Sequence, residues 1–314
     1  MTNLVAVLCA LIVLASAHAG GRLSPAAKDF LPIAIREGYV DSAGSLHGSE
    51  DDDVSITEQL ALSTNSVDLQ VYLGVSYLYQ DPPNEDSALK WITRAAEQGN
   101  NTVASLAAGL LLYHRRQLGA ARPLLKQASE AGEMYGHYYL GRLIFEEASQ
   151  NQQRSQTPEI DEAASLFTLA VDEIVEAQHS LAVMHEYGLL GEADTESSAE
   201  FLHEEAARRG SIASMYHLAL MYAFGRGPTQ DFYKAQSLFQ RVIEHNPDHA
   251  PSLRFLGLFQ AKGYGSIAPD YDAAIVYYED CAKAAGDEEY PEIGSICVDE
   301  RDRLSDVIQR VRNP

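Results

Sequence analysis

The stretch GSIASMYHLALMYAFGRGPTQDFYKAQSLFQRVI, residues 210–243, predicts two helices joined by a short turn. Gly225 and Gly227 can adopt the left-handed backbone that ends a helix, and Pro228 cannot continue one. Asp231 is placed to cap a second helix, in which apolar residues recur every three or four positions. Two amphipathic helices of this length cannot bury their apolar faces alone, so the stretch predicts a stack of similar helix pairs.

The same pattern recurs on both sides of this stretch. The position of Leu218 in the first helix is matched by a leucine or an alanine in five other places: Leu73, Ala108, Leu140, Leu181 and Leu256. Consecutive matches are 32 to 41 residues apart, which fits helix pairs joined by loops of variable length. The sequence therefore predicts six helix pairs.

Three segments carry a resemblance to a known family: ALKWITRAAEQG (residues 88–99), AEFLHEEAARRG (residues 199–210) and LALMYAFGRGPTQDFYKA (residues 218–235). They resemble the Sel-one-like repeat family, a relative of the tetratricopeptide repeats. The match is specific in the first, fourth and fifth pairs. Residues 114–117 replace the glycine turn of the second pair, and residues 148–160 are an insertion in the third. The resemblance implies an all-α, right-handed α-solenoid of antiparallel helix pairs that takes part in protein–protein interaction.

The N-terminus predicts export. Residues 4–17 are an apolar run, and Ala17-His18-Ala19-Gly20 fits a signal-peptide cleavage site. The alternative is an uncleaved anchor, because the first three residues lack Lys and Arg. We expect a secreted or periplasmic protein, or one of the endoplasmic reticulum lumen in a eukaryote. The expected parts are a signal peptide (1–19), an acidic segment with a capping helix (20–65), six repeats (66–289) and a C-terminal capping helix (290–314).

Local signals mark where several helices start and stop. Pro32 is expected to interrupt or end a short helix within residues 24–37. Asn246 occupies the slot in which glycine ends other helices, and asparagine is the next-best left-handed residue. The last helix is expected to begin near Ser295. It should cap the end of the array, with its apolar face on the last repeat and its charged face towards solvent.

Charge and cysteine usage restrict the partners and the compartment. The net charge of −22 argues against nucleic acid and anionic membranes, and it favours a basic protein or peptide partner. A membrane is expected only through an associated partner. Cys281 and Cys297 are expected to form a disulfide, with two buried free thiols as the alternative. Asn100 begins a glycosylation sequon that matters only in a eukaryotic host.

Patterns that carry enzyme chemistry find little support. Ser87 and Lys90 match the Ser-x-x-Lys pattern of penicillin-recognising enzymes, but the accompanying motifs are missing from the sequence. His245 and His249 have the spacing of a helical metal pair, but Pro247 separates them. We expect no catalytic residues, no metal site and no cofactor.

The first helices of the pairs are expected to line a concave groove, the usual recognition surface of solenoids. Counting outward from the repeat leucine predicts groove-lining side chains rich in tyrosine and charge, a composition typical of interfaces. They are Tyr79, Tyr113, Tyr135, Tyr138, Arg142, His179, Tyr187, Tyr216, Phe224 and Arg254. We expect an exported, non-enzymatic adaptor or scaffold that binds a protein or peptide there. A glycan or peptidoglycan strand in the same groove, or a weak penicillin-binding enzyme, are the alternatives, and the oligomeric state is left open.

Overall fold

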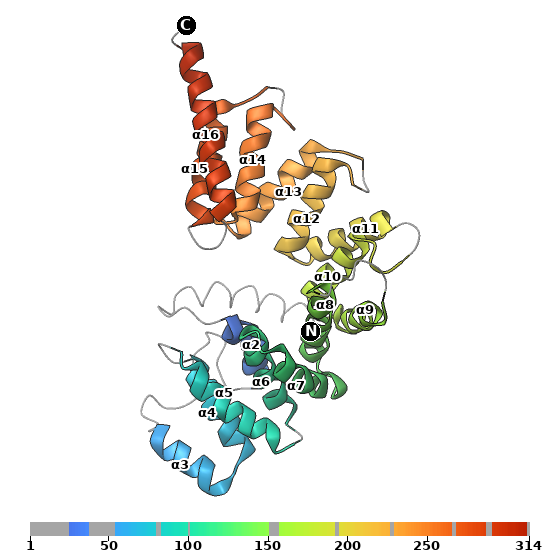
Figure 1. The fold of residues 1–314 in the computed structure, drawn as a ribbon, viewed down its shortest axis with the longest axis vertical. Coiled ribbons are helices and arrows are strands. Elements are labelled where there is room, and N and C mark those ends of the chain that lie inside the picture. Colours follow the sequence, from blue (N-terminus) through green and yellow to red (C-terminus); the bar gives the residue numbers. More distant parts are fainter. Residues whose placement is uncertain are drawn as a thin grey trace. The chain divides into compact units, whose positions relative to one another are not determined.

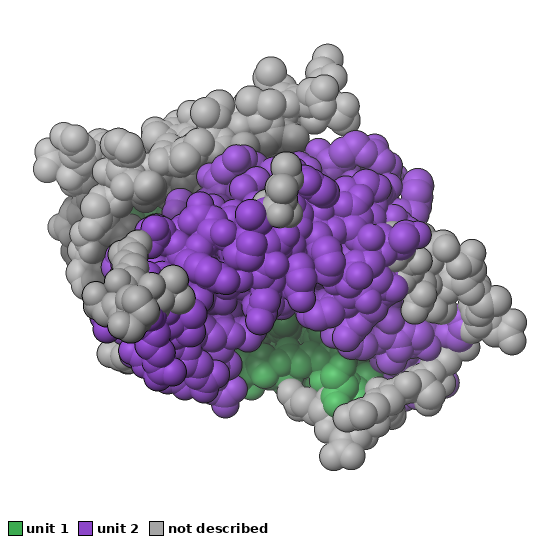
Figure 2. All heavy atoms as spheres, turned by 90° about the horizontal axis from the view of Figure 1, so that it is seen from above, with its two compact units in different colours: residues 1–152 green, residues 153–314 purple. Residues whose placement is uncertain are grey.

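A computed structural model describes residues 25–37, 54–79, 83–99, 101–150, 157–191, 195–226, 229–265, 268–286 and 291–312 (Figure 1). In this part of the chain every regular element is an α-helix. The chain divides into two compact units, residues 1–152 and residues 153–314, which Figure 2 draws in different colours. The predicted signal peptide and Asn100 lie outside the described residues.

Seven described helices belong to the N-terminal unit: α2 (Pro25–Arg36), α3 (Val54–Thr64), α4 (Val67–Tyr79), α5 (Glu85–Glu97), α6 (Thr102–His114), α7 (Leu118–Glu130) and α8 (Met134–Gln150). We call the first helix of each repeat its A helix and the second its B helix. The A helices here are α4, α6 and α8, and α4 and α6 pack on the B helices α5 and α7.

The C-terminal unit contains α9 (Pro158–Ala170), α10 (Val175–Glu186), α11 (Thr195–Arg208), α12 (Ile212–Phe224), α13 (Phe232–His245), α14 (Ala250–Lys262), α15 (Tyr271–Ala285) and α16 (Pro291–Arg312). Its A helices α10, α12 and α14 pack on the B helices α11, α13 and α15. The prediction of an all-α array of paired helices is confirmed.

The helix ends follow the local sequence signals in most places. Asp231 caps α13, because its carboxylate accepts a hydrogen bond from the Lys234 amide at 3.0 Å. Gly225 ends α12 in the left-handed conformation, with φ of 65°. In the second pair, where the glycine is replaced, Arg116 itself takes a φ of 61°. A side chain in this conformation costs about 1 kcal/mol, which is the local cost of losing the glycine.

Three local predictions need correction. Pro32 lies inside α2, which continues to Arg36, and Pro32 is half-buried there. Asn246 has φ of −136°, so α13 ends without a left-handed residue, just before Pro247. Helix α16 begins at Pro291, within the expected capping segment 290–314 but four residues before Ser295, where its start was expected.

Glycines allow the helices of the N-terminal unit to approach closely. A Cβ atom on Gly109 of α6 would lie 2.7 Å from Leu125 Cδ2 of α7. On Gly136 of α8 it would lie 2.6 Å from the backbone nitrogen of Ser129 and 2.8 Å from the carbonyl carbon of Ala128. Side chains can move to make room, but the backbone of a packed helix cannot, so Gly136 is the more constrained position.

The last two helices are covalently joined. Cys281 of α15 and Cys297 of α16 form the predicted disulfide, and both residues are fully buried. Leu304 of α16 packs against the same core cluster, whereas Val307 stays exposed.

Among the described residues, none of the helices combines the length and the apolar composition needed to span a bilayer.

Candidate functional site

In the N-terminal unit, the face formed by the A helices is occupied by a helix of the chain itself. Helix α2 packs against α6 and α4 (Figure 1). Ala27, Leu31 and Ala34 recur at helical spacing on α2 and are buried, as is Ile33. Helix α2 therefore presents an apolar face to the A helices, as a bound amphipathic peptide would.

Polar contacts fix the position of α2 at both ends. The Tyr79 hydroxyl donates to the carbonyl oxygen of Ala27 at 2.7 Å, and His114 Nε2 lies 2.5 Å from Asp29 Oδ2. At the other end, Arg36 Nη2 donates to Glu133 Oε1 at 2.9 Å. Burial raises the pKa of Tyr79, which keeps its hydroxyl protonated as a donor.

The predicted groove residues of α6 and α8 lie inside this unit rather than on an open surface. Tyr113 and Tyr138 are buried. The Arg142 guanidinium lies 5.4–5.7 Å from the ring centres of Tyr113, Tyr138 and Tyr139. This corrects the expectation for three groove residues: the two tyrosines and Arg142 stabilise the unit through cation–π packing. Tyr135, near the start of α8, is half-buried.

In the C-terminal unit, two predicted aromatic residues are exposed. Tyr187 follows α10 and Phe224 ends α12; their exposed fractions are 62% and 55%. Both lie six residues after the repeat leucine, so they occupy the same place in neighbouring repeats. Phe224 contacts Phe255 edge to face, with ring centres 6.0 Å apart, and Arg226 lies over its ring.

The other predicted residues of this unit make contacts within the chain. Tyr216 is half-buried and packs near the rings of Phe239 and His249. Arg254 of α14 donates to Glu300 of α16 at 3.3 Å. Arg254, expected to line the groove, therefore already has a carboxylate partner on α16 of its own unit.

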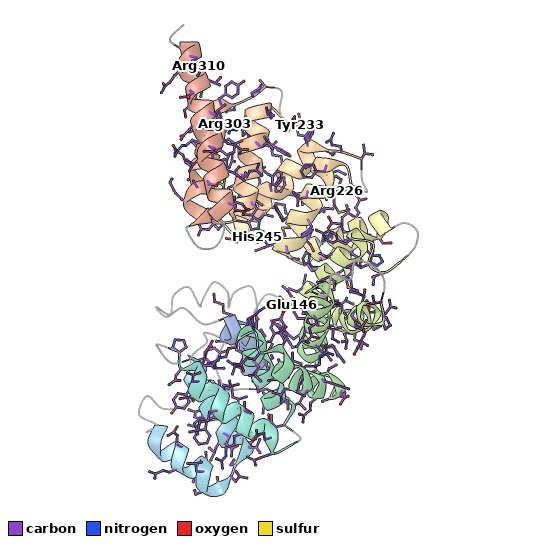
Figure 3. The ribbon with its side chains drawn as sticks, in the orientation of Figure 1. Glu146, Arg226, Tyr233, His245, Arg303 and Arg310 are labelled. Atoms are coloured by element: carbon purple, nitrogen blue, oxygen red, sulfur yellow. A yellow bond between two sulfur atoms is a disulfide. The ribbon has the colours of Figure 1, made fainter. Side chains whose placement is uncertain are left out.

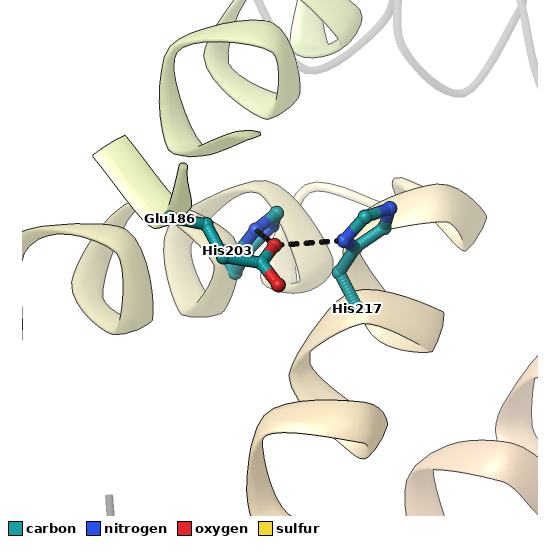
Figure 4. A group of neighbouring side chains, drawn as sticks. All are labelled: Glu186, His203 and His217. Atoms are coloured by element: carbon teal, nitrogen blue, oxygen red, sulfur yellow. Dashed lines mark hydrogen bonds and ion pairs between the residues drawn. The ribbon is translucent and has the colours of Figure 1, made fainter. Parts of the chain in front are cut away.

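A group of ionisable side chains joins three successive helices (Figure 4). Glu186 ends α10, His203 lies in α11 and His217 in α12. His217 Nδ1 is 2.9 Å from Glu186 Oε2, and His203 Nε2 is 3.6 Å from the same oxygen. The three possible ligand atoms all lie within 4.8 Å of one another. Side chains from separate helices thus converge on one point.

A serine and a third imidazole ring, that of His179, complete the surroundings of this group. The Ser214 hydroxyl lies 3.0 Å from His179 Nδ1 and 3.2 Å from His203 Nδ1. The rings of His203 and His217 are stacked, with centres 5.2 Å apart. His179, a predicted groove residue, therefore lies beside the group.

Electrostatics favour the unprotonated forms of two members. Burial raises the pKa of the Glu186 carboxyl, but contacts with His203 and His217 outweigh this and lower it to about 2. Burial lowers the pKa of His203 more than the nearby Glu186 carboxylate raises it, and His217 adds to the lowering. At neutral pH the group therefore presents a carboxylate and a neutral imidazole.

The sequence alone does not reveal this group. His203 and His217 are 14 residues apart, and Glu186 precedes His203 by 17, so no short metal-binding motif is present. The available signal was the repeat register: the end of one A helix, the following B helix and the next A helix each carry one member.

Comparisons with known proteins agree with this architecture. The Sel1 repeat family model matches residues 67–100, 175–211, 212–246 and 250–280. The chain carries Sel1 repeats. They coincide with the first, fourth, fifth and sixth helix pairs, and the two pairs that depart from the sequence pattern lie outside the matched segments. The comparison with curated proteins finds no match.

Solved structures show the same fold. One is a protective antigen of uropathogenic Escherichia coli strains with an SLR fold (20% identity, TM-score 0.63). The similarity covers 86% of this chain and 59% of the antigen, so the chain spans little more than half of that protein. A Sel1 repeat protein from Oxalobacter formigenes is 20% identical with a TM-score of 0.57, covering 91% of this chain and 80% of its own. The human IFIT1 dimer with PPP-AAAA is 15% identical, with a TM-score of 0.52. The similarity covers 89% of this chain and 63% of the IFIT1 chain.

Proposed function

We propose that this protein is a non-enzymatic scaffold that binds an amphipathic helical segment of a protein partner on the A-helix face of residues 153–314. The observation that carries this proposal is the packing of α2 on the A helices of the N-terminal unit. There a helix with an apolar face and charged edges already lies on that kind of surface, held by Tyr79, His114 and Glu133. Helical scaffolds use this recognition mode for short partner segments.

Exposed aromatic side chains support the choice of the C-terminal unit. Tyr187 and Phe224 occupy equivalent positions of two adjacent Sel1 repeats. Aromatic rings supply much of the binding energy at interfaces because they bury a large area with few rotatable bonds. The strongly acidic chain favours a partner segment with basic residues beside its apolar face.

We also propose that the scaffold acts outside the cytosol. The apolar run of residues 4–17 and the Ala17-His18-Ala19 site support export. The buried Cys281–Cys297 disulfide supports an oxidising compartment, since such bonds persist mainly there. Intact-mass measurement of protein from the native host tests this point. The mass of a chain that begins at Gly20 is expected, and retention of Met1 would argue against cleavage.

The binding experiment compares the two faces of one unit. A partner captured by the wild-type protein is titrated against a Tyr187→Ala/Phe224→Ala variant and against Tyr233→Ala. Tyr233 lies on the B helix α13 and is 67% exposed, so it is the matched control (Figure 3). Loss of an aromatic anchor is expected to cost about 2 kcal/mol, or roughly thirtyfold in Kd. Equal loss in both variants, or loss in Tyr233→Ala alone, would place recognition elsewhere.

A further inference from the structure

We propose that Glu186, His203 and His217 form a binding site for one Zn²⁺ ion that links three successive helices of the C-terminal unit. The site would take its ligands from α10, α11 and α12, that is, from both helices of one Sel1 repeat and the first helix of the next.

The donor set fits zinc. Two imidazole nitrogens and one carboxylate oxygen form a ligand set typical of tetrahedral zinc sites with an open fourth position. A calcium site would need six or more oxygen ligands, which this group does not offer. Intermediate ligands such as imidazole suit Zn²⁺ and its transition-metal neighbours, so Co²⁺ can serve as a spectroscopic substitute.

The spacing of the ligand atoms also fits. In a tetrahedral site with bonds of about 2.05 Å, neighbouring ligand atoms are about 3.3 Å apart. The two separations from Glu186 Oε2 bracket this value, at 2.9 Å to His217 Nδ1 and 3.6 Å to His203 Nε2. All three atoms lie within 4.8 Å of one another. Small side-chain rotations are enough to bring them to bonding distance of one ion.

A buried nitrogen points to a ligand at this place. His203 is fully buried, and its Nε2 makes no hydrogen bond within the unit. The separation of 3.6 Å from Glu186 Oε2 is too long for a hydrogen bond. Buried polar atoms of native proteins nearly always have a partner, and a metal ion would supply one here.

The shared serine can fix the tautomer that a metal requires. Ser214 has one hydroxyl proton and lies within hydrogen-bond distance of both His179 Nδ1 and His203 Nδ1. It can donate to only one ring and must accept from the other. If it accepts from His203 Nδ1–H, the lone pair of Nε2 faces the Glu186 carboxylate, and a cation between the two removes their repulsion. Metal-binding histidines commonly donate their second nitrogen to such an outer partner.

The position leaves a route for the ion. Glu186 and His217 are partly exposed, whereas His203 forms the closed end of the site. An ion can therefore enter past His217. Because only the folded arrangement brings the three helices together, bound zinc would stabilise this part of the unit.

Zinc titration of tag-free, chelator-treated full-length protein tests the proposal. Calorimetry is expected to show one Zn²⁺ per chain with submicromolar Kd, and Co²⁺ to give the visible absorption of a tetrahedral site. Zinc is also expected to raise the Tm of the wild type. His217→Ala and Glu186→Gln should each weaken binding at least a hundredfold and abolish the Tm increase.

Two controls separate this site from adventitious binding and from misfolding. His245→Ala removes an exposed histidine of α13 and is expected to bind zinc like the wild type. Far-UV circular dichroism checks that the metal-free variants are folded; His217 is partly exposed, so its variant is expected to pass. Absence of binding at micromolar zinc, or equal binding by the wild type, His217→Ala and Glu186→Gln, would overturn the proposal.

Discussion

Replacing Trp91 with alanine tests the packing of the first repeat. Trp91 is 3% exposed and packs with Ala61 of α3 and Leu73 of α4. Its indole nitrogen donates to Glu58 Oε1 at 3.1 Å, and the Tyr77 hydroxyl donates to the same oxygen at 2.7 Å. Truncating a buried tryptophan costs about 3–5 kcal/mol. Because Glu58 keeps its bond from Tyr77, no carboxylate is left unpaired, and we expect a loss of about 4 kcal/mol within that range.

Denaturant unfolding followed by far-UV circular dichroism measures this loss. The method does not depend on tryptophan fluorescence, which the variant lacks because Trp91 is the only tryptophan. Trp91→Phe keeps an aromatic ring but loses the indole donor, so it is expected to cost only about 1–2 kcal/mol. The wild-type emission should be that of a buried indole. A solvent-exposed emission spectrum, or a loss below about 1 kcal/mol for Trp91→Ala, would refute the packing described for α3, α4 and α5.

Three further changes have defined outcomes. Gly136→Ala is expected to lower stability by about 1–3 kcal/mol in thermal unfolding, since the added Cβ atom would meet the backbone of α7. A Cβ atom on Gly119 would meet no atom within 4 Å, so Gly119→Ala should be neutral or slightly stabilising. Cys297→Ser opens a loop closed across 16 residues and should lower stability by about 3 kcal/mol, while alkylation of the native wild type should find no free thiol at either cysteine. Leu31→Asp places a charge on the buried face of α2 and should make α2 sensitive to limited proteolysis. Lys28→Asp changes an exposed position and should leave α2 resistant to the protease. Equal resistance of both variants would argue against the docking of α2.

Much of the fold could be predicted from the sequence because its signals are local. Helical spacing of apolar residues, the cap at Asp231 and the turn at Gly225 each act within a few residues, and the structure contains all three. The disulfide could be predicted because Cys281 and Cys297 were the only cysteines left after the expected signal peptide. Because the pattern repeats, the prediction made for residues 210–243 could be extended to the other helix pairs.

The candidate sites could not be predicted because they depend on distant segments. Tyr113 and Tyr138 have the register of groove residues, but their burial depends on how α6, α8 and α2 pack. Likewise, Arg254 is paired by Glu300, a residue 46 positions later. The position of a residue in a repeat predicts the direction of its side chain, but it does not predict what another part of the chain places in front of it.

The docking of α2 sets an order of events during protein synthesis. Helix α2 leaves the ribosome long before its docking surface, since His114 is added 85 residues after Asp29. At roughly 5–20 residues per second, this delay lasts about 4 to 17 s. During these seconds the apolar face around Leu31 has no docking surface, because α6 has not yet been synthesised. Chaperones and other nascent copies can bind to it in this period. Helix α2 is thus synthesised before the other described helices of its unit, but it can dock only after α6 has been made.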